Sequence, residues 1–318
     1  MVFDLVVAVA ALIIGIAVMA YSSDKAVEHS LKIATALRIS PLVIGLVLVS
    51  VGTDLPEIVN SITSSAIGHG DINIGNSLGS TLTQITLILG LFPFLAGKLR
   101  VNKREVLVIG ACLVLSLILA VSIAEKGYVT RINALFLMAS WIVFILLARS
   151  TLAKKDRKKE VEMPIADENQ RHRFRHWIIA VLGFVGVAIG SYVVVQSVIS
   201  LSASLMISEY ILSFFLVAIG TSLPELVVTI TALRKKQYAL SIGNIIGSCL
   251  FDASFVIGIG LFVFPQAVSG GLAMTTGLYA IFGCIVALLL LATRSKIDRK
   301  AGVILIVIYL FSYSLMTL

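Results

Sequence analysis

Four acidic side chains lie where the surrounding sequence is otherwise apolar. Of the 17 acidic residues in the chain, Asp54, Glu57, Glu225 and Asp252 fall well inside long apolar segments. A charge at the centre of a membrane costs at least about 2.5–3.5 kcal/mol, so such a group normally faces a partner or a water-filled cavity. Every lysine and arginine lies in or near a polar loop, so no basic partner is expected beside them. Four acids without a countercharge indicate a binding site for cations.

The sequence around these acids occurs twice. Residues 52–57 (GTDLPE) are similar to residues 220–225 (GTSLPE), and residues 75–80 (GNSLGS) are similar to residues 243–248 (GNIIGS). Both motifs are repeated at the same distance, 168 positions, from 57 to 225 and from 80 to 248. Two motifs that share one offset, with no insertion between them, indicate an internal duplication.

The repeated segments also carry neutral oxygen ligands. In four pairs a hydroxyl side chain stands four positions before an acid or an amide, so that the two share a helix face: Thr53–Glu57, Thr221–Glu225, Ser80–Gln84 and Ser248–Asp252. Pro56 and Pro224 each precede a central glutamate, and a proline there cannot donate to the carbonyl four residues back. We therefore expect bent helices whose free carbonyls, hydroxyls and carboxylates coordinate hard cations.

The composition is that of an integral membrane protein. The 318 residues are 58% hydrophobic and only 13% charged, whereas a soluble domain is about half apolar and a quarter charged. The short alternating segments of a β-barrel are absent. The net charge of +8 comes from basic residues in short loops, so it predicts topology rather than nucleic-acid binding.

The apolar runs predict an all-α integral membrane protein with ten transmembrane helices, arranged as two inverted five-helix repeats. The runs cover about 1–21, 40–67, 72–97, 104–124, 128–148, 174–200, 208–233, 239–265, 270–293 and 301–317. The expected units are a first repeat over residues 1–149, a cytoplasmic linker over 150–173 and a second repeat over 174–318.

Basic residues predict the orientation. All of the 25 lysines and arginines except Lys126 and Arg131 fall in the loops that are cytoplasmic if the N-terminus is outside. We therefore expect a multi-pass protein of the cell membrane with both termini extracytoplasmic. Five crossings separate the two copies, and an odd number turns the second copy upside down. The expected site lies where the two copies meet.

At the repeated motifs the chain resembles the cation/calcium antiporter superfamily and, within it, prokaryotic sodium/calcium exchangers. The resemblance implies that helices 2, 3, 7 and 8 enclose the ions and that helices 1 and 6 slide across them. It implies Glu57 and Glu225 as the principal calcium ligands. Further ligands implied for sodium or calcium are Thr53, Thr221, Ser222, Ser80, Ser248 and Asp252, with backbone oxygens near Ser50 and Ala218.

Two positions depart from the pattern of this superfamily. Asp54 stands where a serine is usual, as Ser222 is in the second repeat, and Gln84 stands where an asparagine or aspartate is usual. We include both in the predicted metal-binding set. Because close carboxylates repel one another, at least one of the four acids is expected to bind a proton in some transport states, and Asp54 or Asp252 is our hypothesis for it.

The sequence thus favours a secondary antiporter that exchanges calcium for sodium at one alternating-access site. Proton/calcium exchange by the same superfamily and, less favoured, a cation channel are alternatives. An intramembrane hydrolase is disfavoured because no nucleophile–base pair occurs inside the apolar segments. We expect no enzymatic activity, no cofactor, no nucleic acid and no obligatory protein partner. The expected partners are calcium and sodium ions, with protons as an alternative, and membrane lipid.

Overall fold

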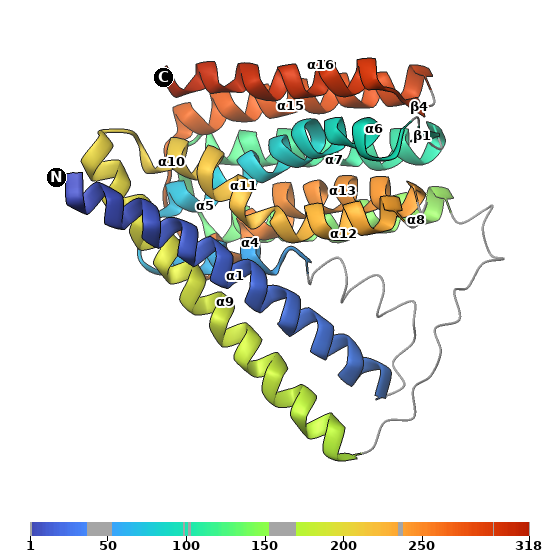
Figure 1. The fold of residues 1–318 in the computed structure, drawn as a ribbon. Helices are drawn as coiled ribbons and strands as arrows, with labels where there is room; N and C mark the ends of the chain where they lie inside the picture. Colours follow the sequence, from blue (N-terminus) through green and yellow to red (C-terminus); the bar gives the residue numbers. More distant parts are fainter. Residues whose placement is uncertain are drawn as a thin grey trace.

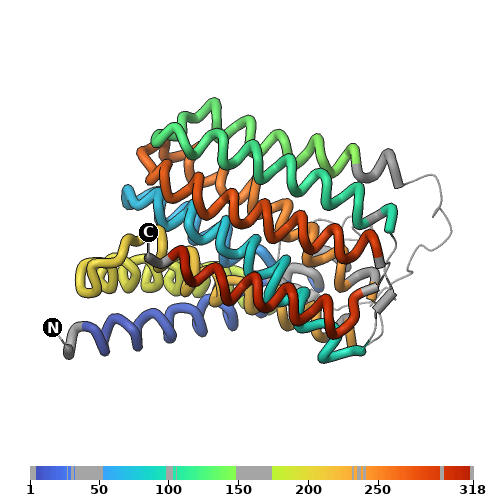
Figure 2. Tube along the Cα trace, turned by 90° about the horizontal axis from the view of Figure 1, so that it is seen from above, coloured from blue at the N-terminus to red at the C-terminus, as the bar shows by residue number. Residues whose placement is uncertain are grey.

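A computed structural model describes residues 2–36, 53–97, 99–100, 103–152, 170–234, 238–294 and 296–317. These residues are almost entirely helical, as the apolar runs predict, and most helices run side by side along one direction (Figures 1 and 2). The predicted linker over 150–173 lies mainly outside the described residues. The first and last described residues lie at the same end of the molecule (Figure 1).

Three long helices form the centre of the molecule, and each contains a π-helical segment. The first is α5 (Gly70–Leu82), η2 (Thr83–Ile88) and α6 (Leu89–Ala96) in succession. The second is α10 (Glu209–Leu212), η3 (Ser213–Val217) and α11 (Ala218–Thr221), followed by α12 (Leu223–Arg234). The third is α13 (Tyr238–Phe251), η4 (Asp252–Val256) and α14 (Ile257–Val263).

Shorter or simpler helices surround this centre. They are α4 (Leu55–Ala66), α7 (Lys103–Ala124), α8 (Arg131–Leu152), α15 (Gly270–Arg294) and α16 (Arg299–Ser312), which ends in the 3-10 turn η5 (Tyr313–Thr317). One hydrophobic core joins side chains from α5, α7, α13 and α15, among them Leu78, Leu113, Ile245 and Cys284. The central helices are therefore held by apolar packing on the side away from their polar faces.

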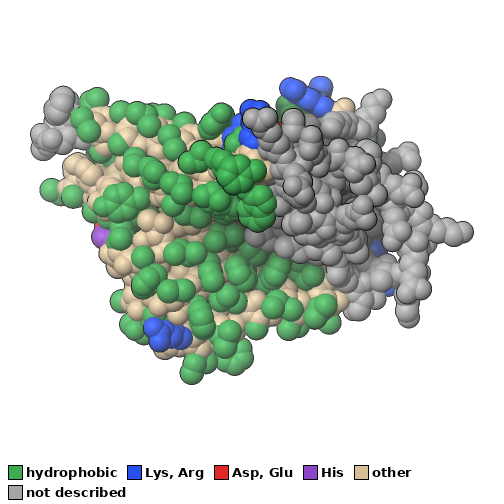
Figure 3. Space-filling view, turned by 90° about the horizontal axis from the view of Figure 1, so that it is seen from below, with side chains coloured by type: hydrophobic (Ala, Val, Ile, Leu, Met, Phe, Trp, Pro, Cys, Tyr) green, Lys and Arg blue, Asp and Glu red, His purple; other side chains and the backbone are tan. Residues whose placement is uncertain are grey.

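Helices α1 (Val2–Ala36) and α9 (Gln170–Leu205) pack along each other and cross the other helices obliquely (Figure 1). Their own core, which includes Met19 and Val194, also contacts Leu55 and Val59 of α4. Seen from below, where this pair lies, the described surface is largely apolar and shows no acidic side chain (Figure 3). Such a surface suits contact with lipid chains.

Helix α1 extends beyond its predicted end. We expected a helix over residues 1–21 and then a polar link through Lys25, Lys32 and Arg38, but α1 continues to Ala36. Glu28 accepts hydrogen bonds from Lys25 at 2.9 Å and from Lys32 at 2.8 Å, and pairs spaced i, i+3 and i, i+4 stabilise an exposed helix. Arg38 lies outside the described residues.

Two small antiparallel sheets tie opposite ends of the molecule. Strand β1 (Leu99–Arg100) pairs with β4 (Lys296–Ile297), and β2 (Tyr128–Val129) pairs with β3 (Gln266–Ala267). Helix α7 runs from β1 to β2, and its 22 residues span about 33 Å, so the two sheets are about a membrane's thickness apart. Each sheet joins a segment from before residue 150 to one from after residue 260.

Seven described helical stretches are long and apolar enough to cross a membrane. They are Leu5–Ala26, Gly70–Ala96, Val106–Ala124, Phe174–Leu205, Glu209–Ile230, Ser241–Val263 and Gly270–Thr293, and Arg131–Leu147 is a shorter apolar helix. The expected segments 40–67 and 301–317 are represented by α4 and α16, of 12 and 14 residues. Residues 37–52 lie outside the described part of the chain, so ten crossings remain a prediction.

The contact of α5 with the continuous helix α10–η3 depends on two glycines of the first GNxxGS motif. A Cβ atom at Gly75 or Gly79 would overlap the backbone carbonyl oxygen of Tyr210 or Phe214. A backbone atom cannot move aside as a side-chain tip can, so the two helices approach this closely only because both residues lack a side chain.

We therefore expect Gly79→Ala to destabilise the protein. Overpacking of this kind typically costs about 1–3 kcal/mol, so the purified variant should unfold at a Tm lower by several degrees. The matched control is Gly271→Ala on the exposed first turn of α15, where no described atom lies within 4 Å of an added Cβ. Equal Tm values for the two variants would contradict the close approach.

Candidate cation-binding site

The backbone presents the repeated motifs in the same way in both copies. Asp54 precedes α4 with φ −79° and ψ 9°. Ser222, 168 positions later, separates α11 from α12 with φ −79° and ψ 7°. Each residue stands directly before a Leu-Pro-Glu sequence that begins a helix segment, where the missing N–H of proline is tolerated. Glu57 and Glu225 therefore lie in the first turn of a new helix segment at the centre of the fold.

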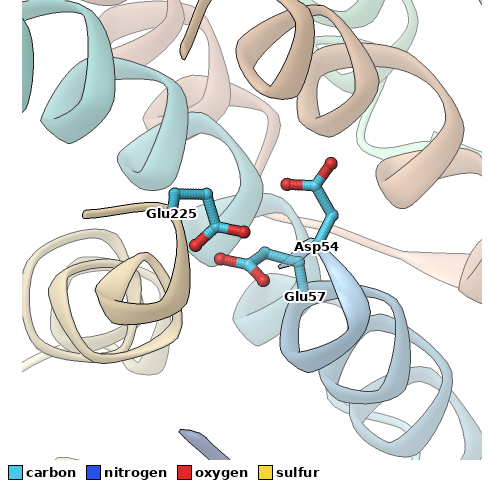
Figure 4. A group of neighbouring side chains, drawn as sticks. All are labelled: Asp54, Glu57 and Glu225. Carbon is cyan, nitrogen blue, oxygen red and sulfur yellow. The ribbon is translucent and has the colours of Figure 1, made fainter. Parts of the chain in front are cut away.

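Three carboxylates from these two segments meet. Asp54, Glu57 and Glu225 each offer one oxygen atom, and these atoms all lie within 4.8 Å of one another (Figure 4). The side chains of Glu57 and Glu225 point toward each other from α4 and α12 (Figure 4). All three residues are 0% exposed. The expectation that Glu57 and Glu225 come together is thus met by the geometry.

These carboxylates have few partners. Neither oxygen atom of Glu57 or Glu225 accepts a hydrogen bond from a described residue, and the same holds for Oδ2 of Asp54. The ion pairs among the described residues involve Lys25, Lys32 and His69, none of them at this cluster. Buried charges without a partner are unfavourable, so the cluster requires cations or protons to neutralise it.

Asp54 is held from the side by α13. Its Oδ1 accepts a short hydrogen bond from the hydroxyl of Ser248. This contact joins the first copy of one motif to the second copy of the other motif. Asp54 therefore belongs to the site and is not a surface acid, although the corresponding residue of the second repeat, Ser222, has no charge.

The fourth acid, Asp252, lies outside the group of three and is bound by Gln84. The Nε2 of Gln84 donates to Oδ2 of Asp252 at 3.0 Å and, in a longer contact of 3.4 Å, to Oγ of Ser222. Gln84 lies in η2 and Asp252 begins η4, and π-helical turns often occur at functional sites. We expected four close carboxylates, whereas three cluster and the fourth is engaged by an amide.

Neutral oxygens complete the site. The hydroxyls of Ser80 and Thr221 lie 3.3 Å apart, and Thr221 donates to Oδ1 of Asn76 at 3.1 Å. The carbonyl oxygen of Ala218 accepts from the backbone N–H of Ser222 at 3.2 Å. Every described member of the predicted set is buried: Thr53, Asp54, Glu57, Ser80, Gln84, Ala218, Thr221, Ser222, Glu225, Ser248 and Asp252. Ser50 lies outside the described residues.

Sequence reasoning missed two amides of this region. Asn76 lies inside the first GNxxGS motif and accepts the hydrogen bond from Thr221. Asn60 lies three residues after Glu57 and is fully buried. The sequence could have indicated both, because Asn60 is spaced i+3 from Glu57 and Asn76 is spaced i−4 from Ser80, so each shares a helix face with a predicted ligand.

The chemistry of this donor set suits hard cations. Its described members offer carboxylate, hydroxyl, amide and carbonyl oxygens, which are the ligands of calcium in proteins. Cys249 is close by, and its Sγ contacts Oε1 of Gln84 at 3.4 Å. Cys249 is one soft atom among many oxygens, so the set does not favour a thiophilic metal.

Comparison with known proteins agrees with this chemistry. The sodium/calcium exchanger protein family matches residues 7–149 and 175–318 of the chain. The putative antiporter CaxA of Alkalimonas amylolytica is 28% identical over 320 residues, which cover 96% of this chain and 97% of that protein.

Solved structures of exchangers share the fold. A structure of the sodium-calcium exchanger NCX_Mj is 28% identical to this chain, with a TM-score of 0.62, and the match covers 98% of this chain and 99% of that one. The H+/Ca2+ exchanger CAX is 15% identical, with a TM-score of 0.75, and the match covers 98% of this chain and 85% of that one. The chain therefore belongs to the sodium/calcium exchanger family, whose members are transporters and not enzymes, and it is a multi-pass membrane protein that exchanges calcium and other cations.

Proposed function

We propose that this protein exchanges calcium for sodium across the cell membrane by alternating access at the carboxylate cluster. The observation that carries the proposal is the meeting of Asp54, Glu57 and Glu225 within 4.8 Å, fully buried and without a basic partner among the described residues. The sequence relationship to the sodium-calcium exchanger NCX_Mj favours sodium as the counter-ion.

Competition for the same oxygens is the physical basis of the exchange. The carboxylates of Glu57 and Glu225 balance the two charges of one calcium ion, and several sodium ions supply the same neutralisation. An empty cluster retains its negative charge, and moving that charge through a medium of low dielectric constant is costly. The site therefore changes the side to which it opens when it is loaded, and calcium movement is coupled to the counter-ion.

We propose the other members of the predicted set as the remaining ligands. Ser248 and Ser80 provide hydroxyl oxygens, and Ala218 and Ser50 provide backbone oxygens. Thr53, Thr221, Ser222, Gln84 and Asp252 complete the proposed set. Asp252 takes part through Oδ1, which accepts no hydrogen bond from a described residue, while its Oδ2 accepts from Gln84 at 3.0 Å.

We further propose ten transmembrane helices in two inverted five-helix repeats, with units at residues 1–149 and 174–318 joined by a cytoplasmic linker over 150–173. The matched stretches 7–149 and 175–318 support this division. The two sheets support the inversion. Strand β1 pairs with β4 at one end of the molecule, and β2 pairs with β3 at the other. Strand β3 lies 167 positions after β1, and β4 lies 168 positions after β2, so the equivalent strands of the two repeats are at opposite ends.

Proton/calcium exchange is the second candidate, and two residues favour it. Asp54 adds a carboxylate that Ser222 lacks in the other repeat, and its Oδ1 accepts a short hydrogen bond from Ser248. Gln84 stands where an asparagine or aspartate is usual, and its amide donates to Asp252. A carboxylate that alternates between a proton and calcium would couple transport to the pH gradient.

Charge-neutral variants test the cluster itself. We expect Glu57→Gln and Glu225→Gln to weaken calcium binding at least a hundredfold, because even outer-shell partners of metal ligands change affinity by about 10–100-fold. Binding is measured as the rise of Tm with calcium concentration in purified protein. The control is Glu125→Gln, an exposed acid far from the cluster. Wild-type calcium binding by both glutamine variants would refute the site.

Calcium uptake into liposomes tests the counter-ion. We expect purified protein to accumulate calcium against its gradient when sodium is inside and choline outside, and not when a pH gradient alone is imposed. Protein-free liposomes are the control. Uptake driven only by pH would replace sodium with protons, and rapid uptake down the calcium gradient without any counter-ion would indicate a channel.

Single cysteines test the orientation. Lys126 follows α7, near the sheet of β2 and β3, whereas Lys300 lies beside β4 at the other end, and both are exposed. We expect Lys126→Cys to react with a membrane-impermeant maleimide on intact cells, and Lys300→Cys only after the membrane is opened. The native cysteines are buried and give little background. The reverse labelling pattern would mean that both termini face the cytoplasm.

A further inference from the structure

The side-chain amide of Asn60 is buried and has no hydrogen-bond partner among the described residues. Its side chain is 0% exposed, and neither Oδ1 nor Nδ2 contacts a polar atom of any described residue. Leaving buried polar atoms unpaired costs about 1–3 kcal/mol, so such a group in a native protein calls for an explanation, such as an ion or an ordered water.

Neighbouring amides do not share this state. Asn73 donates to the hydroxyl of Ser65 and to the carbonyl of Ile257, both at 3.3 Å. Asn76 accepts from Thr221, and Gln84 donates to Asp252. Each of these amides has a structural role in joining helices, whereas the described contacts of Asn60 leave both of its side-chain polar atoms available to a ligand.

Asn60 lies on the same face of α4 as Glu57. It stands three residues after Glu57 and four before Ser64, so the three share one helix face. The neighbouring faces have other functions. Leu55 packs in the core beneath α1 and α9, and Ser61 donates to the carbonyl of Val256 at 2.6 Å.

The serine that follows on this face is not available for a ligand. The hydroxyl of Ser64 donates to the backbone carbonyl of Asn60 at 2.7 Å. Asn60 is therefore the first uncommitted oxygen ligand along α4 after Glu57. Helix α4 runs from the cluster toward the end of the molecule at which the N–H of Gly70 donates to Oε1 of Gln266 at 3.0 Å.

The second repeat has no equivalent of Asn60. The position 168 residues later is Val228. The next position is polar in both repeats, Ser61 in the first and Thr229 in the second. The amide therefore makes the two halves of the site unequal. One half offers an extra neutral oxygen beside its glutamate, and the other offers an apolar side chain.

We propose that Asn60 and Glu57 together form a subsite for a monovalent cation, the extra sodium ion that must bind when sodium replaces calcium. This inference rests on the proposed exchange. Several sodium ions need more oxygen ligands than one calcium ion, and a carboxylate with a neutral amide balances a single positive charge. Ligand number and ligand charge set cation preference in oxygen sites, so Asn60 determines specificity for sodium more than for calcium.

The variant Asn60→Val copies the residue of the second repeat and removes the amide oxygen. We expect the sodium concentration that half-saturates the Tm increase to rise about tenfold, as for the loss of one contact worth about 1.4 kcal/mol. The half-saturating calcium concentration should change less than about twofold. Choline chloride controls for ionic strength, and Ser64→Ala is the matched control because its hydroxyl bonds only to the backbone of α4.

The variant Asn60→Asp separates ligation from packing. It keeps the size and the oxygen atom, so sodium must still stabilise the protein, and the added charge should strengthen calcium binding. Unchanged sodium dependence in Asn60→Val, an equal loss for both ions, or loss of sodium binding in Asn60→Asp would each overturn the subsite. Absence of any sodium effect in the wild-type protein would instead refute sodium as the counter-ion.

Discussion

The structure depends on negative charge that is buried where no basic side chain balances it. Two carboxylates near each other at low dielectric constant repel strongly, yet Glu57 and Glu225 point toward each other with no described partner. Apolar packing must hold them together, and cores on both sides of the central helices provide it. The arrangement is stable with bound cations or protons, and this requirement couples the cluster to the ions that the protein moves.

Interrupted helices let the backbone take part in the site. Helices α4 and α12 begin directly after Asp54 and Ser222, each with the sequence Leu-Pro-Glu. The π-helical segments η2 and η4 lie opposite and carry Gln84 and Asp252. Regular α-helices would bond all their carbonyls internally. Breaks at the centre of the fold turn the side chains of four helix segments toward one point, while the flanking turns remain apolar and regular.

The two halves use one pattern but not the same residues. In the second repeat, the position equivalent to Asp54 is Ser222, and the position equivalent to Gln84 is Asp252. The position equivalent to Asn60 holds an apolar residue. The two repeats therefore carry negative charge at different positions of the site, although Asp54 and Ser222 have the same backbone conformation. Cation preference and fold thus depend on different residues. Proline and glycine determine where the helices begin, and the side chains beside them provide the ligands.

The sequence alone determined the membrane class and showed the repeated motifs and the acids inside apolar segments, because such residues and repeats are visible without coordinates. Glu57 and Glu225 were predictable for that reason. Only the tertiary structure decided which acids meet. Asp252, which accepts a hydrogen bond from Gln84, lies outside the group of three that contains Asp54. Helix α1 continues through residues that the sequence predicted as a polar link. Such outcomes depend on contacts between segments far apart in the chain, which local spacing does not specify.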